Sequence, residues 1–573
     1  MKKNPRLLGD QHVKAVCEAL GKYIKQESID EYPNKIVKTV KYIVSIFPNI
    51  QNVESKFSEK HPDLTNDLKL FLNDNATITV NLFLIKKGAR IQPKNLGAKS
   101  FFSKYFLSQT LQDSFNIAFE EKYIKFLSGL LEAKEGVHYI ANKREMKSRI
   151  SSYFPNFLKE INPLRDKFLY GLREECFFLL KDFFNEKNEA FFHAYNVLFM
   201  TEDTNIITAY GSREEDVAVY EFNPGKPSFR DIEIYKVGKN TVGIKYGEVG
   251  LTLRFKFESG PTSSIKLAIS YEELPDNLEI STINSKTIHR MSELINSHIY
   301  LETTNSSNAI GKCHEALTYY YFLKEYPEIL QVDPEDSINL LDRYYSSIKP
   351  TVLNNLYSST STIVPVIREH LDEKYSLYEI SSIELIPDSY IDDKLNTGDL
   401  QLILKKAGNY IIENISLKAL ARRGTKITTK NPGIGSILGS TYFNVGSLEP
   451  VVKEVKSKFQ VGELNHQGSL EALSLALGEQ LGHATQEQLK RGVENLLGKA
   501  VMAVTFYEES ISYCKEHSQI KTPIMVSVRQ PTPIQNTLSW SNGLETISLR
   551  VKFSKRQAYG WSTIKLTSEY QLK

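Results

Sequence analysis

Residues Asp399 to Lys418 read DLQLILKKAGNYIIENISLK, and this stretch predicts a β-hairpin. An apolar run follows Asp399, and a second run rich in isoleucine follows the turn-forming pair Gly408-Asn409. β-branched and aromatic residues bounded by Gly and Asn are typical of paired strands. Asp399 begins the first strand and Lys418 lies near the end of the second. We therefore expect the two side chains to meet at one edge of the sheet.

The alternation of side chains along the second strand decides which acid can join Lys418. Asn414, Ser416 and Lys418 are spaced by two residues and share one face. Glu413 is five residues from Lys418, so it points to the opposite face unless a bulge intervenes. Glu413 is one candidate for the second acid beside Lys418, but the alternation favours an acid from another element.

An acid and a lysine at one sheet edge can hold a divalent cation and orient a water beside it. Magnesium prefers oxygen ligands, keeps several waters, and uses one or two carboxylates together with substrate phosphate. Such a cation activates water and stabilises charge on a phosphate. The alternative is structural, because an Asp often begins a strand after a turn and a Lys often protects an edge.

The hairpin resembles the core of the PD-(D/E)XK nucleases, especially the type II restriction endonucleases. GDLQLIL at 398–404 and ISLKA at 415–419 form the resemblance, and NAIGKCHEAL at 308–317 resembles the helix before the hairpin. The resemblance covers Ser307 to Phe443. It implies a mixed-sheet α/β core that cleaves double-stranded DNA with Mg²⁺, with Lys418 orienting or activating the water.

The sequence departs from that family at one position. The second acid usually stands two residues before the lysine, where this chain has Ser416. Some family members take the acid from a different element, so the resemblance favours Glu315 as the second metal ligand beside Asp399. Glu413, or no second acid at all, are the alternatives. His314 has no second histidine at ligand spacing, so it is expected to be structural.

A basic segment follows the hairpin, ARRGTKITTK at 421–430. Arginines, lysines and hydroxyls beside a catalytic edge suit contacts with DNA phosphates, which position a duplex without reading its sequence. The other interpretation is a solvated loop. The candidate DNA-binding residues are Arg422, Arg423, Lys426 and Lys430.

Several segments occur once in each half, in the same order, and predict a duplicated domain. LTLRFKF at 251–257 matches ISLRVKF at 547–553, and SSIKLAISY at 263–271 matches STIKLTSEY at 562–570. The weaker matches pair 9–15 with 311–317, 80–87 with 398–406, and 95–106 with 431–443. In this alignment Asn81 stands for Asp399 and Val13 stands for Glu315. Too few residues follow Asn81 for a second hairpin strand, so the first copy is expected to be unable to hold the metal.

The predicted fold is α/β (α+β), with a mixed-sheet nuclease core in the second half and a degenerate copy in the first. A chain of 573 residues exceeds one core. We place the boundary near 273–284, which gives domains 1–280 and 281–573. The first is helical over 101–191 and then β-rich over 205–272. In the second we expect helices at 287–297, at 308–324 and over 468–516, then strands over 522–570.

Composition sets weaker bounds. The net charge of +3 neither favours nor excludes DNA. The four cysteines are far apart, which predicts no disulfide framework and a reducing cytoplasm. The amino-terminal stretch lacks the apolar core of a signal peptide, and the chain lacks 18 consecutive apolar residues, so we expect no membrane partner.

These patterns favour a magnesium-dependent endonuclease that hydrolyses double-stranded DNA, of the type II restriction class. The absence of the G-x-x-x-x-G-K-[ST] loop argues against an NTPase motor. One alternative is a repair or defence nuclease without sequence specificity. Another is an inactive DNA-binding module, if Ser416 marks lost activity. Two chains acting together as a homodimer are expected, because a double-strand break needs two active sites.

Overall fold

The chain folds into two compact units in the computed structural model, Met1–Asp276 and Asn277–Lys573. The division falls inside the range expected from the sequence. Each unit is described by itself. The structure describes residues 5–58, 66–92, 95–136, 142–223, 225, 232–246, 249–273, 277–301, 306–390, 398–516, 520–555 and 560–572.

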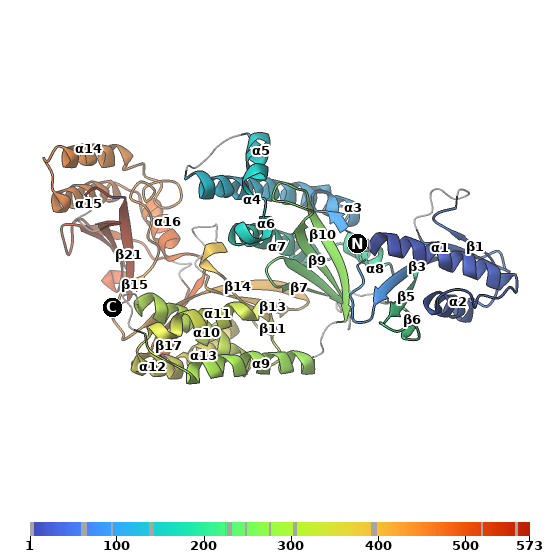
Figure 1. Cartoon of the computed structure of the whole chain (residues 1–573). Helices are drawn as coiled ribbons and strands as arrows, with labels where there is room; N and C mark the ends of the chain where they lie inside the picture. The colour runs from blue at the N-terminus through green and yellow to red at the C-terminus, as the bar shows by residue number, and fades with distance from the viewer. Residues whose placement is uncertain are drawn as a thin grey trace. The chain divides into compact units, whose positions relative to one another are not determined.

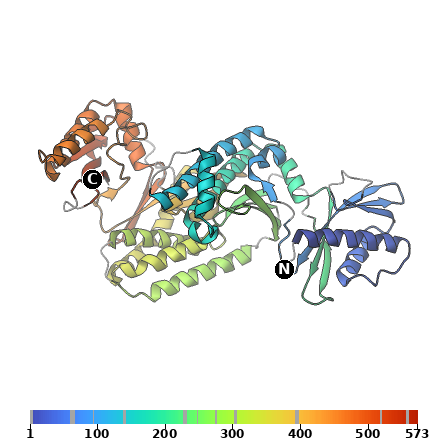
Figure 2. The ribbon, with the colours of Figure 1, turned by 45° about the horizontal axis from the view of Figure 1, so that its top comes forward.

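The first unit begins with a helix pair that crosses one face of a sheet (Figure 2). The sheet order is β1-β2-β3-β5-β6. Apolar side chains of both helices and of the inner strands form one core. The elements are α1 (Pro5–Ile24), α2 (Asn34–Ile46), β1 (Ile50–Ser55), β2 (Leu68–Leu72), β3 (Thr77–Lys86), β5 (Thr204–Tyr210) and β6 (Val217–Glu221).

A helical layer and a second sheet complete the first unit, and α7 contacts three of the strands (Figure 1). The sheet order is β4-β10-β9-β8-β7. The helices are α3 (Phe101–Tyr105), α4 (Gln109–Glu135), α5 (Lys143–Tyr153), α6 (Phe157–Glu160), α7 (Asn162–Asn185) and α8 (Ala190–Phe199), after η1 (Ala98–Ser100). The strands are β4 (Asn95–Gly97), β7 (Ile232–Val237), β8 (Thr241–Tyr246), β9 (Val249–Phe257) and β10 (Ile265–Glu273).

The second unit holds the predicted hairpin in a six-stranded sheet of order β11-β12-β13-β14-β16-β17. Side chains of α10 and α13 pack on the face that presents Leu400, Leu402 and Leu404. The strands are β11 (Leu330–Gln331), β12 (Glu379–Leu385), β13 (Leu400–Lys406), β14 (Asn409–Leu420), β16 (Val501–Phe506) and β17 (Ile511–Lys515). The helices are α9 (Asn277–Asn296), α10 (Ser306–Glu325), α11 (Pro334–Tyr344), α12 (Pro350–Thr360) and α13 (Ile363–Lys374), with η2 (Tyr345–Ser347) and η3 (Asp388–Tyr390).

The second unit ends in a further sheet of order β15-β21-β20-β19-β18, which α15 contacts (Figure 1). Leucines of α15 and α16 pack with the inner strands in one core. The elements are β15 (Ile427–Thr428), α14 (Glu449–Gln460), α15 (His466–Gly482), α16 (Gln486–Leu497), β18 (Met525–Ser527), β19 (Gln535–Trp540), η4 (Ser541–Gly543), β20 (Glu545–Phe553) and β21 (Ile564–Leu572).

The closing hairpins of the two units have the same register. Leu251 pairs with Tyr271 in the first unit, and Ile547 pairs with Tyr570 in the second. At the other end of each hairpin Phe257 pairs with Ile265, and Phe553 pairs with Ile564. These are the positions that the repeated sequence segments align.

The first sheets of the two units also follow one pairing pattern. β1, β2 and β3 pair antiparallel, β3 pairs parallel with β5, and β5 pairs antiparallel with β6. β12, β13, β14, β16 and β17 repeat this sequence of pairings in the same order. By its parallel neighbour, β3 therefore occupies the place of β14, and β2 that of β13.

Two expectations about local structure are wrong. Helices do not continue to residue 516, because α16 ends at Leu497 and 501–515 forms β16 and β17. Every residue of β16 is buried, and a short buried strand cannot be told from a buried helix by periodicity. The hairpin turn lies at Ala407-Gly408 rather than Gly408-Asn409, with φ of 50° and 79°. Two positive φ values are what a two-residue type I′ turn requires.

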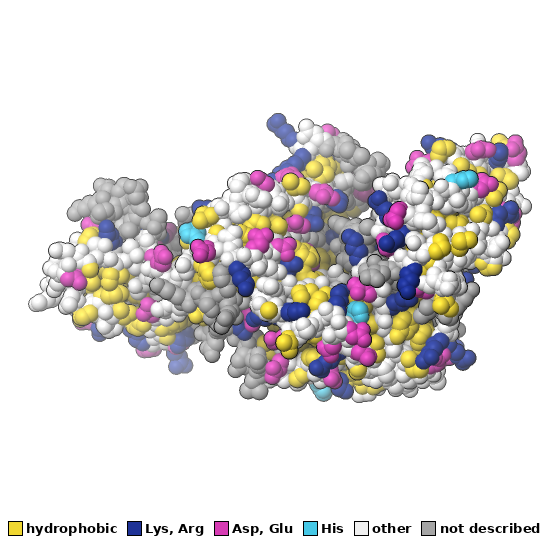
Figure 3. Space-filling view, turned by 180° about the vertical axis from the view of Figure 1, so that it is seen from behind, with side chains coloured by type: hydrophobic (Ala, Val, Ile, Leu, Met, Phe, Trp, Pro, Cys, Tyr) yellow, Lys and Arg dark blue, Asp and Glu magenta, His cyan; other side chains and the backbone are white. Residues whose placement is uncertain are grey.

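Charges on the face in Figure 3 are mixed, with lysines and arginines interspersed among acids. All four cysteines lie in the described ranges and are free thiols. No helix within the described ranges combines enough length and apolar character to cross a membrane.

Candidate active site

Asp399 and Lys418 meet at the edge of the hairpin, as the sequence predicts. Lys418 Nζ lies 3.4 Å from Asp399 Oδ2. The same oxygen accepts a hydrogen bond of 2.7 Å from the Leu417 backbone N–H and one of 3.4 Å from Ser416 Oγ. The side chain of Asp399 is 14% exposed and that of Lys418 27% exposed, so the pair is fixed in place but open to a ligand.

The helix α10 brings Glu315 toward this edge. Glu315 is buried, and burial raises the pKa of its carboxyl to about 8, with a further contribution from the charge of Asp399. Two carboxylates close enough to raise a pKa repel each other when both are ionised. A cation between them would relieve that repulsion.

Lys312 supplies a positive charge at this place. It lies one turn before Glu315 on α10, and its ammonium donates to both Glu315 oxygens at 2.9 and 3.0 Å. Asp388, in η3, lies 2.8 Å from the same ammonium. Burial lowers the pKa of Lys312, but the Glu315 and Asp388 carboxylates outweigh it and raise the pKa overall. Sequence reasoning missed both residues, although the i, i+3 spacing of Lys312 and Glu315 could have pointed to the first.

His314 supports the site from behind. Its Nε2 lies 2.9 Å from Thr505 Oγ1 on β16, and the residue is fully buried. Burial lowers the pKa of His314 to about 3, and the charge of Lys418 lowers it further. The imidazole is therefore neutral at ordinary pH, which agrees with the structural role expected of it.

Glu413 is not brought to the site. Leu402 is its cross-strand partner, so Glu413 lies on the helix-covered face of the sheet. Its carboxylate accepts hydrogen bonds from Lys374 at 3.1 and 3.2 Å and from Tyr375 at 2.7 Å. Gln401 donates to Asn414 at 2.9 Å on the opposite face, as the strand alternation predicts.

The basic segment after β14 presents three cations at the surface, each near an acid of the same unit. Arg422 lies 2.5 Å from Glu508, Arg423 lies 3.3 Å from Glu509, and Lys426 lies 3.6 Å from Glu569. Their side chains are 75%, 63% and 40% exposed in that order. Exposed pairs of this kind are weak and can exchange partners.

Lys430, the last cation predicted to contact DNA, lies differently. Its residue is only partly exposed and its ammonium nitrogen is buried. A buried nitrogen cannot reach a phosphate unless the segment rearranges. The geometry therefore favours the other three cations for contact with DNA.

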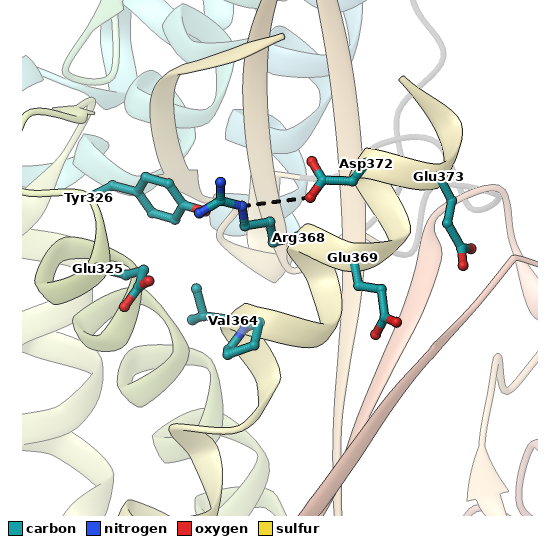
Figure 4. Close-up of a pocket in the computed structure, with 8 residues that line it drawn as sticks. Glu325, Tyr326, Val364, Arg368, Glu369, Asp372 and Glu373 are labelled. Atoms are coloured by element: carbon teal, nitrogen blue, oxygen red, sulfur yellow. Dashed lines mark ion pairs between the residues drawn. The ribbon is translucent and has the colours of Figure 1, made fainter. Parts of the chain in front are cut away.

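An acidic hollow on α10 and α13 lies apart from these residues (Figure 4). It measures about 620 Å³ and is lined by Glu325, Glu369, Asp372 and Glu373. Arg368 pairs with Asp372 at 3.7 Å and lies over the ring of Tyr326. Its excess of acids repels phosphate, so this hollow is unsuited to DNA.

The first unit contains an acid placed like Asp399, but it is Asp67 rather than Asn81. Asp67 precedes β2 and accepts a hydrogen bond of 2.8 Å from the Leu82 backbone N–H on β3. The expected alignment of 80–87 with 398–406 is wrong, because β3 takes the place of the second hairpin strand. There is consequently room for that strand.

The surroundings of Asp67 differ from those of Asp399. Lys56 Nζ lies 2.9 Å from Asp67 and 3.2 Å from Asp10 of α1. Leu82 stands where Leu417 stands in the second unit, so Phe83 takes the place of Lys418. His12 of α1 is buried, as His314 of α10 is, and burial lowers the pKa of His12 to about 4.

Within the described residues, no group of three or more His, Cys, Asp and Glu side chains is arranged to hold a metal ion. The pair of Glu315 and Asp399 still fits magnesium, which uses one or two carboxylates and takes its other oxygens from water and phosphate. The two side chains offer carboxylate oxygens at the same end of the hairpin, and Asp399 remains partly exposed to a ligand, which supports the fit.

Comparison with known proteins establishes the class. The chain belongs to the type II restriction enzymes, which are site-specific deoxyribonucleases. It is 58% identical over all 573 residues to the type II restriction enzyme BsuRI of Bacillus subtilis, and the alignment covers 100% of both chains. No protein-family profile matches the chain, and no solved structure matches it significantly. The prediction of a restriction endonuclease is thereby confirmed.

Proposed function

We propose that the second unit is a PD-(D/E)XK-type nuclease that cleaves double-stranded DNA with Mg²⁺ at Asp399, Glu315 and Lys418. The observation that supports this most is the convergence of the buried Glu315 carboxylate, the partly exposed Asp399 carboxylate and Lys418 at one end of an antiparallel hairpin. The full-length similarity to a restriction enzyme gives the reaction class.

The roles of the side chains follow from their positions. Asp399 and Glu315 would hold the cation, which supplies charge neutralisation at the scissile phosphate and an acidified water. Lys418 Nζ orients the attacking water and stabilises negative charge as hydroxide character develops. The Leu417 N–H fixes Asp399 through its 2.7 Å hydrogen bond. Lys312 keeps Asp388 as a partner when Glu315 turns to the cation.

The first unit is proposed to be a degenerate copy of the nuclease fold that contacts DNA. The shared strand pairing, the shared hairpin register and the two buried histidines support common ancestry. Lys56 neutralises Asp67, while Phe83 and Val13 replace the lysine and the second acid. Among the described residues of this unit, Asp67 is held by Lys56 and lacks a lysine and a second acid at the positions of Lys418 and Glu315, so the unit is proposed to be inactive.

A chain with one active site makes a double-strand break by pairing with another chain or by acting twice. We propose pairing as a homodimer, because simultaneous cuts need two sites. Two chains related by a twofold axis would favour a palindromic site. An order of reaction above one in protein supports pairing, whereas first-order kinetics with accumulating nicked circles would show a single chain acting alone.

Gel electrophoresis of plasmid incubated with protein and Mg²⁺ tests the proposed function. Discrete fragments that require Mg²⁺ are expected. A smear would favour a nuclease without sequence specificity. Intact plasmid with a folded, DNA-binding protein would favour an inactive binding module.

The apparent affinity for Mg²⁺ is expected to rise with pH. The pKa of Glu315 is raised to about 8, so below that pH the cation must displace a proton. The Mg²⁺ concentration that gives half-maximal cleavage should fall as pH increases from 6 to 8.5. Glu315→Gln cannot lose a proton there, so it should flatten this dependence. An equally steep dependence in the variant would contradict the assignment.

Replacing both Arg422 and Arg423 with alanine is expected to weaken DNA binding and reduce its salt dependence. Each lost phosphate contact lowers the slope of log K against log salt by about 0.9. The reciprocal change, Glu508→Gln with Glu509→Gln, should strengthen binding, because it frees both arginines from their acids. Unchanged slopes in both variants would show that this segment does not touch the DNA backbone.

A further inference from the structure

A second basic feature lies in the first unit, far along the sequence from the proposed active site. It is a hollow of about 330 Å³ formed by η1, α4, α5 and the start of β10. Four lysines and three hydroxyls line it together with the rings of Phe119 and Tyr123. The lysines are Lys99, Lys143, Lys147 and Lys266, and the hydroxyls belong to Ser100, Ser263 and Ser264. We call this hollow the lysine pocket.

The acids at the lysine pocket do not balance its lysines. Glu120 forms ion pairs with both Lys99 and Lys143. Lys266 lies 3.8 Å from Glu258, at the outer limit of an ion pair. Among the described residues, these two acids pair with three of the four lysines, so the pocket carries an excess of positive charge.

Lys147 is within electrostatic range of two other lysines of the pocket. Its ammonium and that of Lys143 each lie 5.2 Å from the centroid of the Tyr123 ring. Burial lowers the pKa of Lys147, and the charges of Lys143 and Lys99 lower it further, against the opposing charge of Glu120. Nearby ammonium groups repel one another, and an anion bound among them would offset that repulsion.

We infer that the lysine pocket binds a phosphodiester of the DNA that the second unit cleaves. Lysines and serine hydroxyls are common partners of DNA phosphates. The rings of Phe119 and Tyr123 are buried beneath Lys99, Lys143 and Lys147, and these contacts hold the ammonium groups at the pocket. This inference rests on the proposed DNA contact of the first unit and names the site that makes it.

The pocket is tested by the salt dependence of DNA binding in the full chain with Ca²⁺ in place of Mg²⁺. The probe is a labelled duplex that the wild-type protein cleaves. Lys143→Ala with Lys147→Ala should reduce the slope of log K against log salt by about 0.9 to 1.8, which corresponds to one or two lost phosphate contacts. The DNA concentration that gives half-maximal cleavage should rise in the same variant.

The matched control removes two lysines from the neighbouring helix. Lys125 and Lys134 of α4 pair with Glu121 and Glu160 outside the pocket, so replacing both with alanine removes the same charge. This control should keep the wild-type slope. Equal slopes for the wild type and the pocket variant, in a protein that still cleaves DNA, would overturn the inference and leave the proposed function intact.

Chemical protection separates DNA from small anions. An amine-reactive reagent should modify Lys143 and Lys147 in the free protein, and the duplex should protect them. Inorganic phosphate, added at the concentration of phosphate groups in the duplex, should not protect the two lysines. Protection by inorganic phosphate but not by the duplex would show that the pocket binds small anions and not DNA. An absence of plasmid cleavage by the wild-type protein would instead refute the proposed function.

Discussion

Replacing Asp399 or Lys418 with alanine is expected to lower the rate of plasmid cleavage by at least about 10²-fold, the scale of losing one group that stabilises the transition state. Each variant removes a group used in the chemical step and not a phosphate contact. DNA binding in Ca²⁺ should remain close to that of the wild type. Rapid-quench measurement of supercoiled plasmid loss at saturating Mg²⁺ gives the rate.

Lys406→Ala is the control for Lys418→Ala, since it removes a lysine from the turn end of the same hairpin. Asp67→Ala is the control for Asp399→Ala, because Asp67 accepts an equivalent backbone hydrogen bond in the first unit. Both controls should cleave at nearly the wild-type rate. Near-normal cleavage by Asp399→Ala or Lys418→Ala would show that the site is misplaced.

Glu315→Gln and Glu413→Gln are expected to fail in different ways. Loss of the Glu315 charge removes a metal ligand, so the Mg²⁺ concentration for half-maximal cleavage should rise about 10- to 100-fold or more. Glu413→Gln should leave that concentration within about twofold. It should instead lower the free energy of unfolding by about 1–3 kcal/mol, because Lys374 and Tyr375 lose a buried carboxylate.

Metal titrations of cleavage and thermal denaturation of both variants separate the two effects. An inactive Glu413→Gln beside an active Glu315→Gln would reverse the assignment. A stability loss in Glu315→Gln without a change in metal dependence would make Glu315 a structural partner of Lys312.

The site was predictable where local patterning decides geometry. Hairpin pairing places Asp399 against the residues around Lys418, and the period of two on β14 sends Glu413 to the other face. Strand pairing does not place Glu315, which could be inferred only from the family resemblance. Its approach to the hairpin depends on how α10 packs against β14, which is a tertiary contact that no spacing encodes.

The repeated segments show where sequence matching fails. The closing hairpins align correctly because both keep the same alternation and end at a tyrosine. The sequence of Val80–Lys87 resembles that of the first hairpin strand, β13. However, β3 pairs parallel with β5, as β14 pairs with β16, so it corresponds to the second hairpin strand. Apolar strands resemble one another, so it is the sheet order and the hydrogen bond from the Leu82 N–H that relate the position of Asp67 to that of Asp399.

The buried strand β16 was missed for a related reason. Six buried residues in a row lack the alternation that marks a strand with one exposed face. The position of Asp388 and its pairing with Lys312 also depend on the loop after β12, which periodicity does not describe.

The most direct test of the central claim is affinity cleavage of the protein by Fe²⁺ in the presence of ascorbate and peroxide. Iron bound in place of magnesium generates radicals that cut the nearby backbone. Cuts are expected next to Glu315 and Asp399, and both excess Mg²⁺ and the Asp399→Ala substitution should remove them. Two results would contradict a single metal site in the second unit. One is cutting next to Asp67, and the other is cutting near position 399 that persists in the Asp399→Ala protein.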